Sequence, residues 1–113
     1  MLTIDNLRAW GADTKEGLGR CMNNEAFYLK MVDMFFSDGS KIDALGTALQ
    51  ADDLDEAFEQ AHALKGVCAN LALTPLEIKI SEITELLRAR TQTDYSDMYR
   101  EITVLYDKMK NNE

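Results

Sequence analysis

The sequence is poor in the residues on which several classes of protein depend. Among its 113 residues there is one histidine, one proline, one tryptophan and two cysteines. A single histidine excludes a zinc site built on several imidazoles. Cys21 and Cys68 are too few for the disulfide framework of a small secreted protein. Both lie in segments with helical spacing, so we expect reduced, mostly buried thiols.

Positive charge and long apolar runs are scarce as well. The chain has 12 basic and 20 acidic side chains and a net charge of -8. This balance disfavours binding to nucleic acid, whose phosphates demand basic surfaces, and to anionic lipid. No apolar run approaches the roughly 18 residues of a membrane span. The N-terminus MLTIDNLRAWG lacks the basic start and apolar stretch of a signal peptide. We therefore expect a cytoplasmic protein that binds neither nucleic acid nor membranes.

What is present is a globular composition, with 46% apolar residues and a length that suits one domain, residues 1–113. A short helix is predicted over Ile4–Trp10, ended by Gly11, and Asp13 starts a second short helix that carries Leu18 and Met22. A longer helix follows an N-cap at Asn23 or Asn24. Its apolar positions are Tyr28, Met31, Phe35, Ile42, Leu45 and Leu49. Because the series 28, 35, 42, 49 stays in phase across residues 37–40, we expect one long helix, with a potential kink at Gly39, rather than two independent helices.

The second half of the chain has the cleaner patterns. Asp52 and Asp53 end the long helix and cap the next, whose apolar positions are Leu54, Ala57, Ala61, Leu64, Cys68 and Leu71. Thr74 as cap and Pro75 at the first helical position begin a helix that carries Leu76, Ile80, Ile83 and Leu87. A last helix carries Tyr95, Met98, Ile102, Leu105 and Met109. The pattern predicts an all-α, up-down four-helix bundle with short additional helices at the N-terminus, and the methionines and aromatic residues are interpreted as core filling.

The lone histidine lies off the apolar stripe of its helix. At 100° per residue, His62 is about 130° from the centre of that stripe, so we expect it to be exposed. Phe58, Lys65, Gly66 and Ala69 share its side of the helix. A mid-helix glycine costs about 1 kcal/mol relative to alanine, and Gly66 leaves open space one turn from the imidazole. Lys65, three residues after His62, favours negative charge acquired there. An accessible ring nitrogen beside a cation is a suitable phosphoryl acceptor.

These residues carry a resemblance to a known family. The run Ala61-His62-Ala63-Leu64-Lys65-Gly66, followed by Ala69-Asn70-Leu71, closely resembles the signature of histidine-containing phosphotransfer (HPt) domains. The segments around residues 17–20, 27–29 and 34–36 look like the first helices of that family, so the resemblance covers essentially the whole chain. It implies a four-helix bundle that carries a phosphoryl group between receiver-domain aspartates in a two-component phosphorelay. His62 would be the phosphoacceptor, Lys65 would interact with the phosphoryl oxygens and Gly66 would leave room for approach.

The resemblance also implies the partners and the division of chemistry. The chain would be a phosphocarrier rather than an enzyme, with no bound cofactor or metal. Its partners would be response-regulator receiver domains and a hybrid histidine kinase, and Mg²⁺ would sit on the receiver. We expect a monomer with Phe58, Ala69 and Asn70 on the docking surface. Phe58 is equally typical of a core edge, and Asn70 of plain solvated surface.

The chain departs from the family pattern at three positions. Ala72 stands where Gly is frequent, and Val67 and Cys68 stand where Ser and Ala are common. These positions do not touch the expected phosphoryl site, so they bear on the choice of partner more than on activity.

Three alternatives remain at this point. Glu59-Gln60-Ala61-His62 has the Glu-x-x-His spacing of di-iron bundles, but such sites need two inward-facing copies of the motif. The phosphoacceptor domain of a histidine kinase usually has an acidic residue after the histidine, where this chain has Ala63. The third is a non-phosphorylated HPt-like module that only binds receivers. The presence of both Lys65 and Gly66 beside His62 argues against it.

Overall fold

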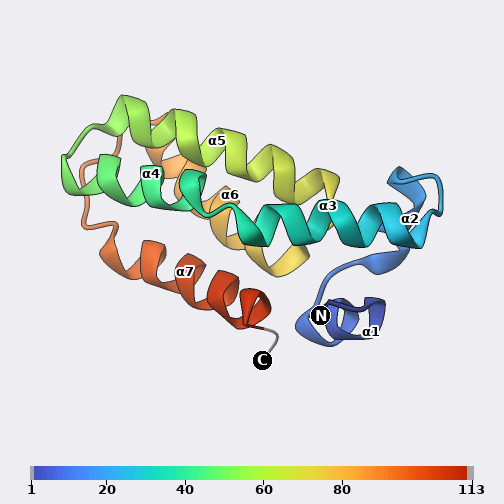
Figure 1. The fold of residues 1–113 in the computed structure, drawn as a ribbon. Coiled ribbons are helices and arrows are strands. Elements are labelled where there is room, and N and C mark those ends of the chain that lie inside the picture. The colour runs from blue at the N-terminus through green and yellow to red at the C-terminus, as the bar shows by residue number, and fades with distance from the viewer. Residues whose placement is uncertain (1, 112–113) are drawn as a thin grey trace.

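The computed structural model describes residues 2–111, in which every regular element is an α-helix. The helices are α1 (Ile4–Trp10), α2 (Thr14–Arg20), α3 (Glu25–Ser37), α4 (Ser40–Gln50), α5 (Leu54–Asn70), α6 (Thr74–Arg88) and α7 (Ser96–Lys110) (Figure 1). Met1, Asn112 and Glu113, which belong to the predicted domain, lie outside the described residues. No helix within residues 2–111 has the length and apolar character that crossing a membrane requires.

Three helix starts follow capping residues predicted from the sequence. The side chains of Asp13, Asn24 and Asp53 each accept a hydrogen bond from a backbone N–H three residues further on. These bonds satisfy donors that the first turn of a helix leaves free. Gly11 ends α1 with a φ of 118°, in the left-handed region that favours glycine.

Several predicted helix boundaries are wrong. Leu71 and Tyr95 are the cap residues just outside α5 and α7 instead of lying within them. Helix α2 ends at Arg20, so Met22 lies outside it, with a positive φ of 57°. Helix α6 has Leu73 as its N-cap residue, without a side-chain cap, and Thr74 is already helical. The Thr74 hydroxyl donates to the carbonyl of Ala72 instead of capping the helix.

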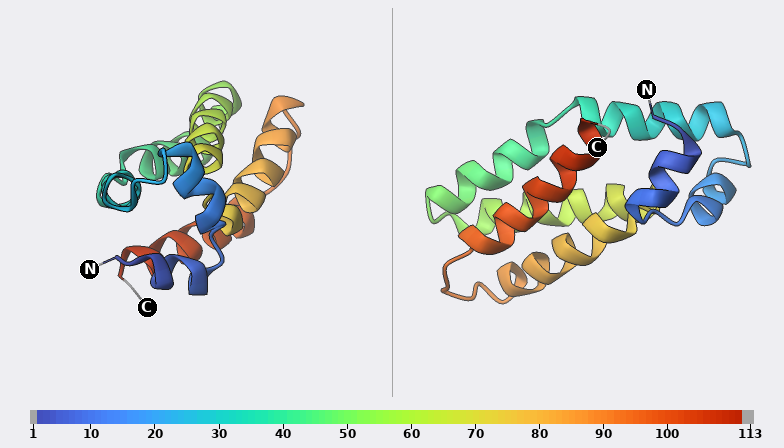
Figure 2. Two further views of the ribbon diagram at one scale, coloured as in Figure 1. Left: turned by 90° about the vertical axis from the view of Figure 1, so that its right-hand side faces the viewer. Right: turned by 90° about the horizontal axis from the view of Figure 1, so that it is seen from below.

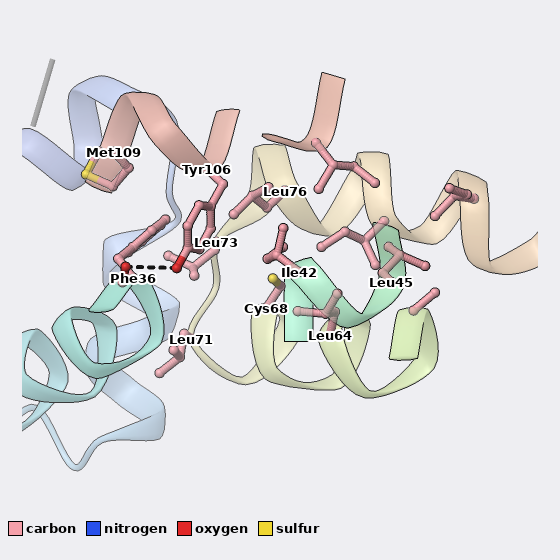
Figure 3. Packing of buried hydrophobic residues seen from close by; sticks show 14 of the residues in the cluster. Phe36, Ile42, Leu45, Leu64, Cys68, Leu71, Leu73, Leu76, Tyr106 and Met109 are labelled. Carbon is pink, nitrogen blue, oxygen red and sulfur yellow. Dashed lines mark hydrogen bonds between the residues drawn. The ribbon is translucent and has the colours of Figure 1, made fainter. Parts of the chain in front are cut away.

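The single long helix predicted through Gly39 is also wrong. The chain breaks at Asp38 and Gly39 into α3 and α4, which follow one another along one side of the molecule. Asp38 has an extended backbone (φ -104°, ψ 92°), and its carboxylate accepts a hydrogen bond from the backbone N–H of Ser40. The break leaves carbonyls free at the end of α3. The hydroxyl of Tyr106 donates to the Phe36 carbonyl at 2.8 Å, which satisfies one of them (Figure 3).

Together α3 and α4 form one side of a four-helix bundle whose other sides are α5, α6 and α7. Helix α5 packs against α4 and α6, α6 also packs against α7, and α7 contacts α3. The short helices α1 and α2 lie at one end of the bundle, with α1 beside the C-terminal end of α7 (Figure 2). There the indole N–H of Trp10 donates to the carbonyl of Leu105 at 3.2 Å. The predicted all-α bundle with short N-terminal helices is confirmed.

The core confirms the stripes predicted for α5 and α6. Their buried apolar residues are Leu54, Ala57, Ala61, Leu64, Cys68, Leu76, Ile80, Ile83 and Leu87, and Leu71 is buried just after α5. Figure 3 shows Leu64 and Cys68 of α5 facing Ile42 and Leu45 of α4. In α3 the pattern is shifted: Tyr28, Val32 and Phe36 are buried, whereas Met31 and Phe35 are half-buried.

The interpretation of the methionines as core filling holds only in part. Met109 is buried in α7, and Met31 and Met98 are half-buried. Met22 and Met34, by contrast, are 86% and 54% exposed. Met1 lies outside the described residues. Part of the apolar pattern of α3 therefore faces outward, where a partner can reach it.

Candidate functional site

The site is positioned by α5, which is anchored at both ends. Asp53 caps its start, where its carboxylate accepts from the Glu56 N–H at 3.1 Å. At its other end the buried hydroxyl of Tyr28 donates to the carbonyl of Leu71 at 2.8 Å. Between these ends one face of α5 lies in the core. His62, Gly66 and Asn70 form a row four residues apart on the outer side and are all exposed, as predicted.

The imidazole of His62 stacks on the ring of Phe58, one turn earlier in α5. Their centroids are 5.6 Å apart and the ring planes differ by 20°. Phe58 is half-buried and packs at the edge of the core, which is one of its two expected roles, whereas its role in docking stays a prediction. The stacking restricts the imidazole to one side of α5, while its exposure leaves the ring open to a reacting partner.

Two arginines complete this part of the site: Arg88, the last residue of α6, and Arg90, which follows the helix. The guanidinium carbons of Arg88 and Arg90 lie 5.1 and 5.0 Å from the centroid of Phe58. We call Phe58, Arg88 and Arg90 the arginine shelf. Cations over an aromatic face are attracted by its quadrupole, and here they bring positive charge close to His62. Neither arginine was predicted to belong to the site, because they lie 26 and 28 positions away from His62 in the chain.

Each arginine of the shelf is paired with a carboxylate. Arg88 Nε lies 2.8 Å from Glu85 Oε2, and Arg90 Nε lies 2.7 Å from Asp55 Oδ1. A hydrogen bond from Arg88 and its charge lower the pKa of Glu85, and the charges of Lys65 and His62 act in the same direction. Glu85, Lys65 and His62 therefore share one electrostatic neighbourhood.

Gly66 leaves open space beside His62. A Cβ added at Gly66 would meet no atom outside its own stretch of helix within 4 Å. Gly17 differs, because a Cβ there would lie 2.5 Å from the ring of Tyr28. Gly17 is thus required by packing inside the protein, whereas Gly66 is not. The open space that the expected role of Gly66 requires is therefore present, and the role itself stays a prediction.

One departure from the family pattern lies at the C-terminal end of α5, where the backbone itself favours glycine. Ala72 follows the C-cap of α5 and has a φ of 55°, in the left-handed region where glycine is favoured. Its methyl group is buried. Cys68 is fully buried in the core, and burial, with a smaller contribution from Glu77, raises the pKa of its thiol to about 12. Both positions therefore act on the folding of α5, while Val67 is half-buried at its surface.

An apolar surface lies on the other side of the outer row, between α3 and the end of α5. A cavity of about 320 Å³ has Met31, Met34, Val67 and Asn70 among its lining residues. A second, of about 330 Å³, shares Met31 and Asn70 and includes Phe27. We call Phe27, Met31, Met34, Val67 and Asn70 the methionine surface. Asn70 belongs to the row of His62 and Gly66, so this surface continues from the histidine.

Of the predicted docking residues, Asn70 is exposed and lines both cavities, and Ala69 is half-buried beside it. The methionines were interpreted as core filling in preference to a binding face, because apolar residues at helical spacing are more often core than interface. The exposed side chains of Glu59 and His62 do not have the inward-facing geometry of a di-iron site. Within residues 2–111 no group of three or more His, Cys, Asp or Glu side chains is placed to hold a metal ion.

Comparison with known proteins gives one match. A family model described as Hpt domain matches residues 30–112, which include α4 to α7 and most of α3. No significant match was found among the curated proteins or among the solved structures. The matched range contains His62, the arginine shelf and all of the methionine surface except Phe27.

Proposed function

Because the chain belongs to the Hpt domain family, whose members take part in histidine phosphotransfer in two-component signalling, we propose that His62 is the phosphoacceptor of a phosphorelay. It takes a phosphoryl group from the aspartyl phosphate of one receiver domain and passes it to the aspartate of another. The observation that carries this proposal is the exposed imidazole of His62 beside the open space at Gly66.

The transfer itself is a balanced exchange of one bond for another. An unprotonated ring nitrogen of His62 attacks the phosphorus, and a new N–P bond forms as the O–P bond to the receiver aspartate breaks. The electron pair of that bond leaves with the aspartate carboxylate. The other ring nitrogen keeps its proton, and the reverse reaction delivers the phosphoryl group to the next receiver.

The receiver supplies most of the charge stabilisation, through its acidic cluster and Mg²⁺, and this chain contributes position and charge. Phe58 holds the imidazole by stacking, at 5.6 Å between centroids. Lys65, three residues from His62 on the same helix, supplies a cation for the phosphoryl oxygens. In this role the chain is a phosphocarrier rather than an enzyme.

The receiver would dock over the row of His62, Gly66 and Asn70 and cover the methionine surface. Exposed Met34 and Phe27 give that contact an apolar centre. Methionine suits a carrier that must bind a donor and an acceptor receiver in turn, because its flexible side chain adapts to different partners. A hybrid histidine kinase would stand upstream of the donor receiver.

The proposal is tested by incubating the protein with a phosphorylated receiver domain and Mg²⁺, in parallel with His62→Gln. We expect acid-labile, base-stable phosphate on the wild type and none on the variant. Because the sequence contains one histidine, any phosphohistidine on this chain is at His62. Thermal unfolding of His62→Gln checks that the fold is kept. Binding to a panel of receivers without any labelling would instead identify a module that only binds receivers.

A further inference from the structure

The ion pair between Arg88 and Glu85 lies next to the histidine without contacting it. Arg88 and His62 both lie against the ring of Phe58, and Arg88 is bound to Glu85 at 2.8 Å. The two partners are 51% and 59% exposed, so the pair is open to solvent and to exchange. Exposed ion pairs are weak, and a stronger anion nearby can therefore replace the carboxylate.

The two arginines of the shelf are held very differently. Arg90 Nη1 donates to the carbonyl of Leu87 at 2.6 Å, in addition to the contact of Arg90 with Asp55. Arg90 also has a φ of 53°, in the left-handed region that favours glycine. An arginine at this position therefore has a less favourable backbone conformation than glycine would have. Within residues 2–111, Glu85 is the sole ion-pair partner of Arg88. Arg90 is therefore the fixed part of the shelf and Arg88 the movable one.

Phosphorylation of His62 would change the competition for Arg88. A phosphoryl group carries close to two negative charges and three acceptor oxygens, against one charge and two oxygens for a carboxylate. Arginine binds both in bidentate fashion, so the more highly charged partner is preferred. Arg88 and His62 both pack on the ring of Phe58, 5.1 and 5.6 Å from its centroid, so the guanidinium lies near the imidazole that would carry the phosphoryl group.

We propose that the phosphoryl group on His62 displaces Glu85 from Arg88, and that this exchange prolongs the life of the phosphohistidine. The proposal rests on the function proposed above. It assigns Glu85 the role of competing with the phosphoryl group for Arg88. While His62 is unphosphorylated, Glu85 neutralises the charge of Arg88. In the phosphorylated state Arg88 holds the phosphoryl oxygens together with Lys65.

The hydrolysis reaction determines whether Arg88 slows or speeds the decay of the phosphohistidine. Water attacks the phosphorus as the N–P bond breaks, the bonding electron pair returns to the imidazole, and inorganic phosphate leaves. In a loose transition state negative charge leaves the phosphoryl oxygens as that bond breaks. A cation on those oxygens therefore stabilises the phosphohistidine more than the transition state and slows its hydrolysis.

The test uses three variants of the full chain and one control variant, each labelled with phosphoramidate, a small donor that needs no receiver. Phosphohistidine decay is followed by ³¹P NMR. We expect about threefold faster decay for Arg88→Gln and about twofold slower decay for Glu85→Gln. In the double variant Glu85→Gln should have no further effect, because Glu85 acts through Arg88. Arg100→Gln, which breaks the exposed i,i+3 pair with Asp97 on α7, is the matched control and should decay like the wild type.

The outcomes separate this inference from the proposed function. If His62 accepts phosphate but Arg88→Gln and Glu85→Gln decay at the wild-type rate, the exchange is wrong and the phosphocarrier function stands. If Glu85→Gln slows decay equally in the Arg88→Gln background, Glu85 acts by direct repulsion and the exchange is again wrong. If neither phosphoramidate nor any phosphorylated receiver labels His62, the proposed function itself fails.

Discussion

The hydroxyl of Tyr106 donates a hydrogen bond of 2.8 Å to the backbone carbonyl of Phe36, across 70 residues of sequence. The bond ties α7 to the point where α3 ends and α4 begins (Figure 3). The Phe35 carbonyl lies 3.2 Å from the same oxygen, so two carbonyls released by the helix break face one donor. The break between α3 and α4 is therefore stabilised by tertiary structure and not by the local sequence alone.

Removing this hydroxyl should destabilise the fold. In Tyr106→Phe the aromatic packing stays, but the Phe36 carbonyl loses its partner in a buried position, which costs about 1–2 kcal/mol. Urea denaturation should show a lower midpoint with an unchanged m-value. The control is Tyr95→Phe, whose hydroxyl donates to Thr91 at a part-buried site only four residues away and should matter less. Equal stability of Tyr106→Phe and the wild type would contradict this account of the break.

The hydrogen bond between Tyr106 and Phe36 also shows which part of the fold could not be predicted from the sequence. The caps at Asp13, Asn24 and Asp53 and the core stripe of α5 depend on neighbours within a few residues, so they were predicted correctly. The division into α3 and α4 depends on Tyr106, which the chain brings to Phe36 only after folding. A heptad that stays in phase across Gly39 carries no information about that contact.

Gly66 and Gly17 should respond in opposite ways to the same substitution. Gly66→Ala adds a methyl group to open space in the middle of a helix and should raise stability by about 0.5–1 kcal/mol. Gly17→Ala places a methyl group 2.5 Å from the ring of Tyr28 and should lower stability, by about 1–3 kcal/mol. Thermal unfolding measures both changes.

The gain in stability at Gly66 should come with a loss of function. Bulkier Gly66→Gln keeps the fold, since nothing lies within 4 Å, but occupies the space through which a receiver approaches His62. Labelling by a phosphorylated receiver should fall about tenfold or more, while labelling by phosphoramidate stays close to the wild-type rate. Wild-type transfer from the receiver to Gly66→Gln would show that the space is not used.

The site was predictable only as far as a single helix reaches. The positions of His62 and Gly66 follow from the 100° turn per residue, and the structure places both on the exposed side of α5. Arg88 and Arg90 reach Phe58 because the end of α6 lies beside the first half of α5, which no pattern within α5 reveals. Exposed Met34 and half-buried Met31 of α3 share the helical spacing of core residues, so only the folded structure separates interface from core.

The methionine surface should be needed for binding to receivers and not for folding. Met34 and Val104 are both 54% exposed, but Val104 lies on α7, outside that surface. Met34→Glu should weaken binding to a receiver about tenfold, because it puts a charge at the apolar centre of the contact. Val104→Glu makes the same change of charge and should bind like the wild type, as measured by calorimetry. Both should change stability by less than about 0.5 kcal/mol, and equal binding by the two variants would place the docking surface elsewhere.

Stability should fall steeply in alkaline solution because of two buried tyrosines. Burial raises the pKa of Tyr28 and that of Tyr106 to about 12, from about 10 in the unfolded chain. The folded protein therefore holds these two phenol protons more tightly than the unfolded chain does. Their contribution is fully present below about pH 10 and is lost as the pH rises from about 10 to about 12.

Each of these tyrosines should steepen the pH dependence of the free energy of unfolding by up to about 1.4 kcal/mol per pH unit within that window. Tyr106→Phe and Tyr28→Phe remove one titrating group each and should give a shallower decline, although both start from a lower stability at neutral pH. Urea unfolding at a series of pH values between about 8 and 11 measures the slopes. The raised pKa of Cys68 adds to the decline in the wild type and both variants alike, so it does not affect the comparison. Parallel curves for the wild type and both variants would mean that the two phenols titrate alike in the folded and unfolded chains.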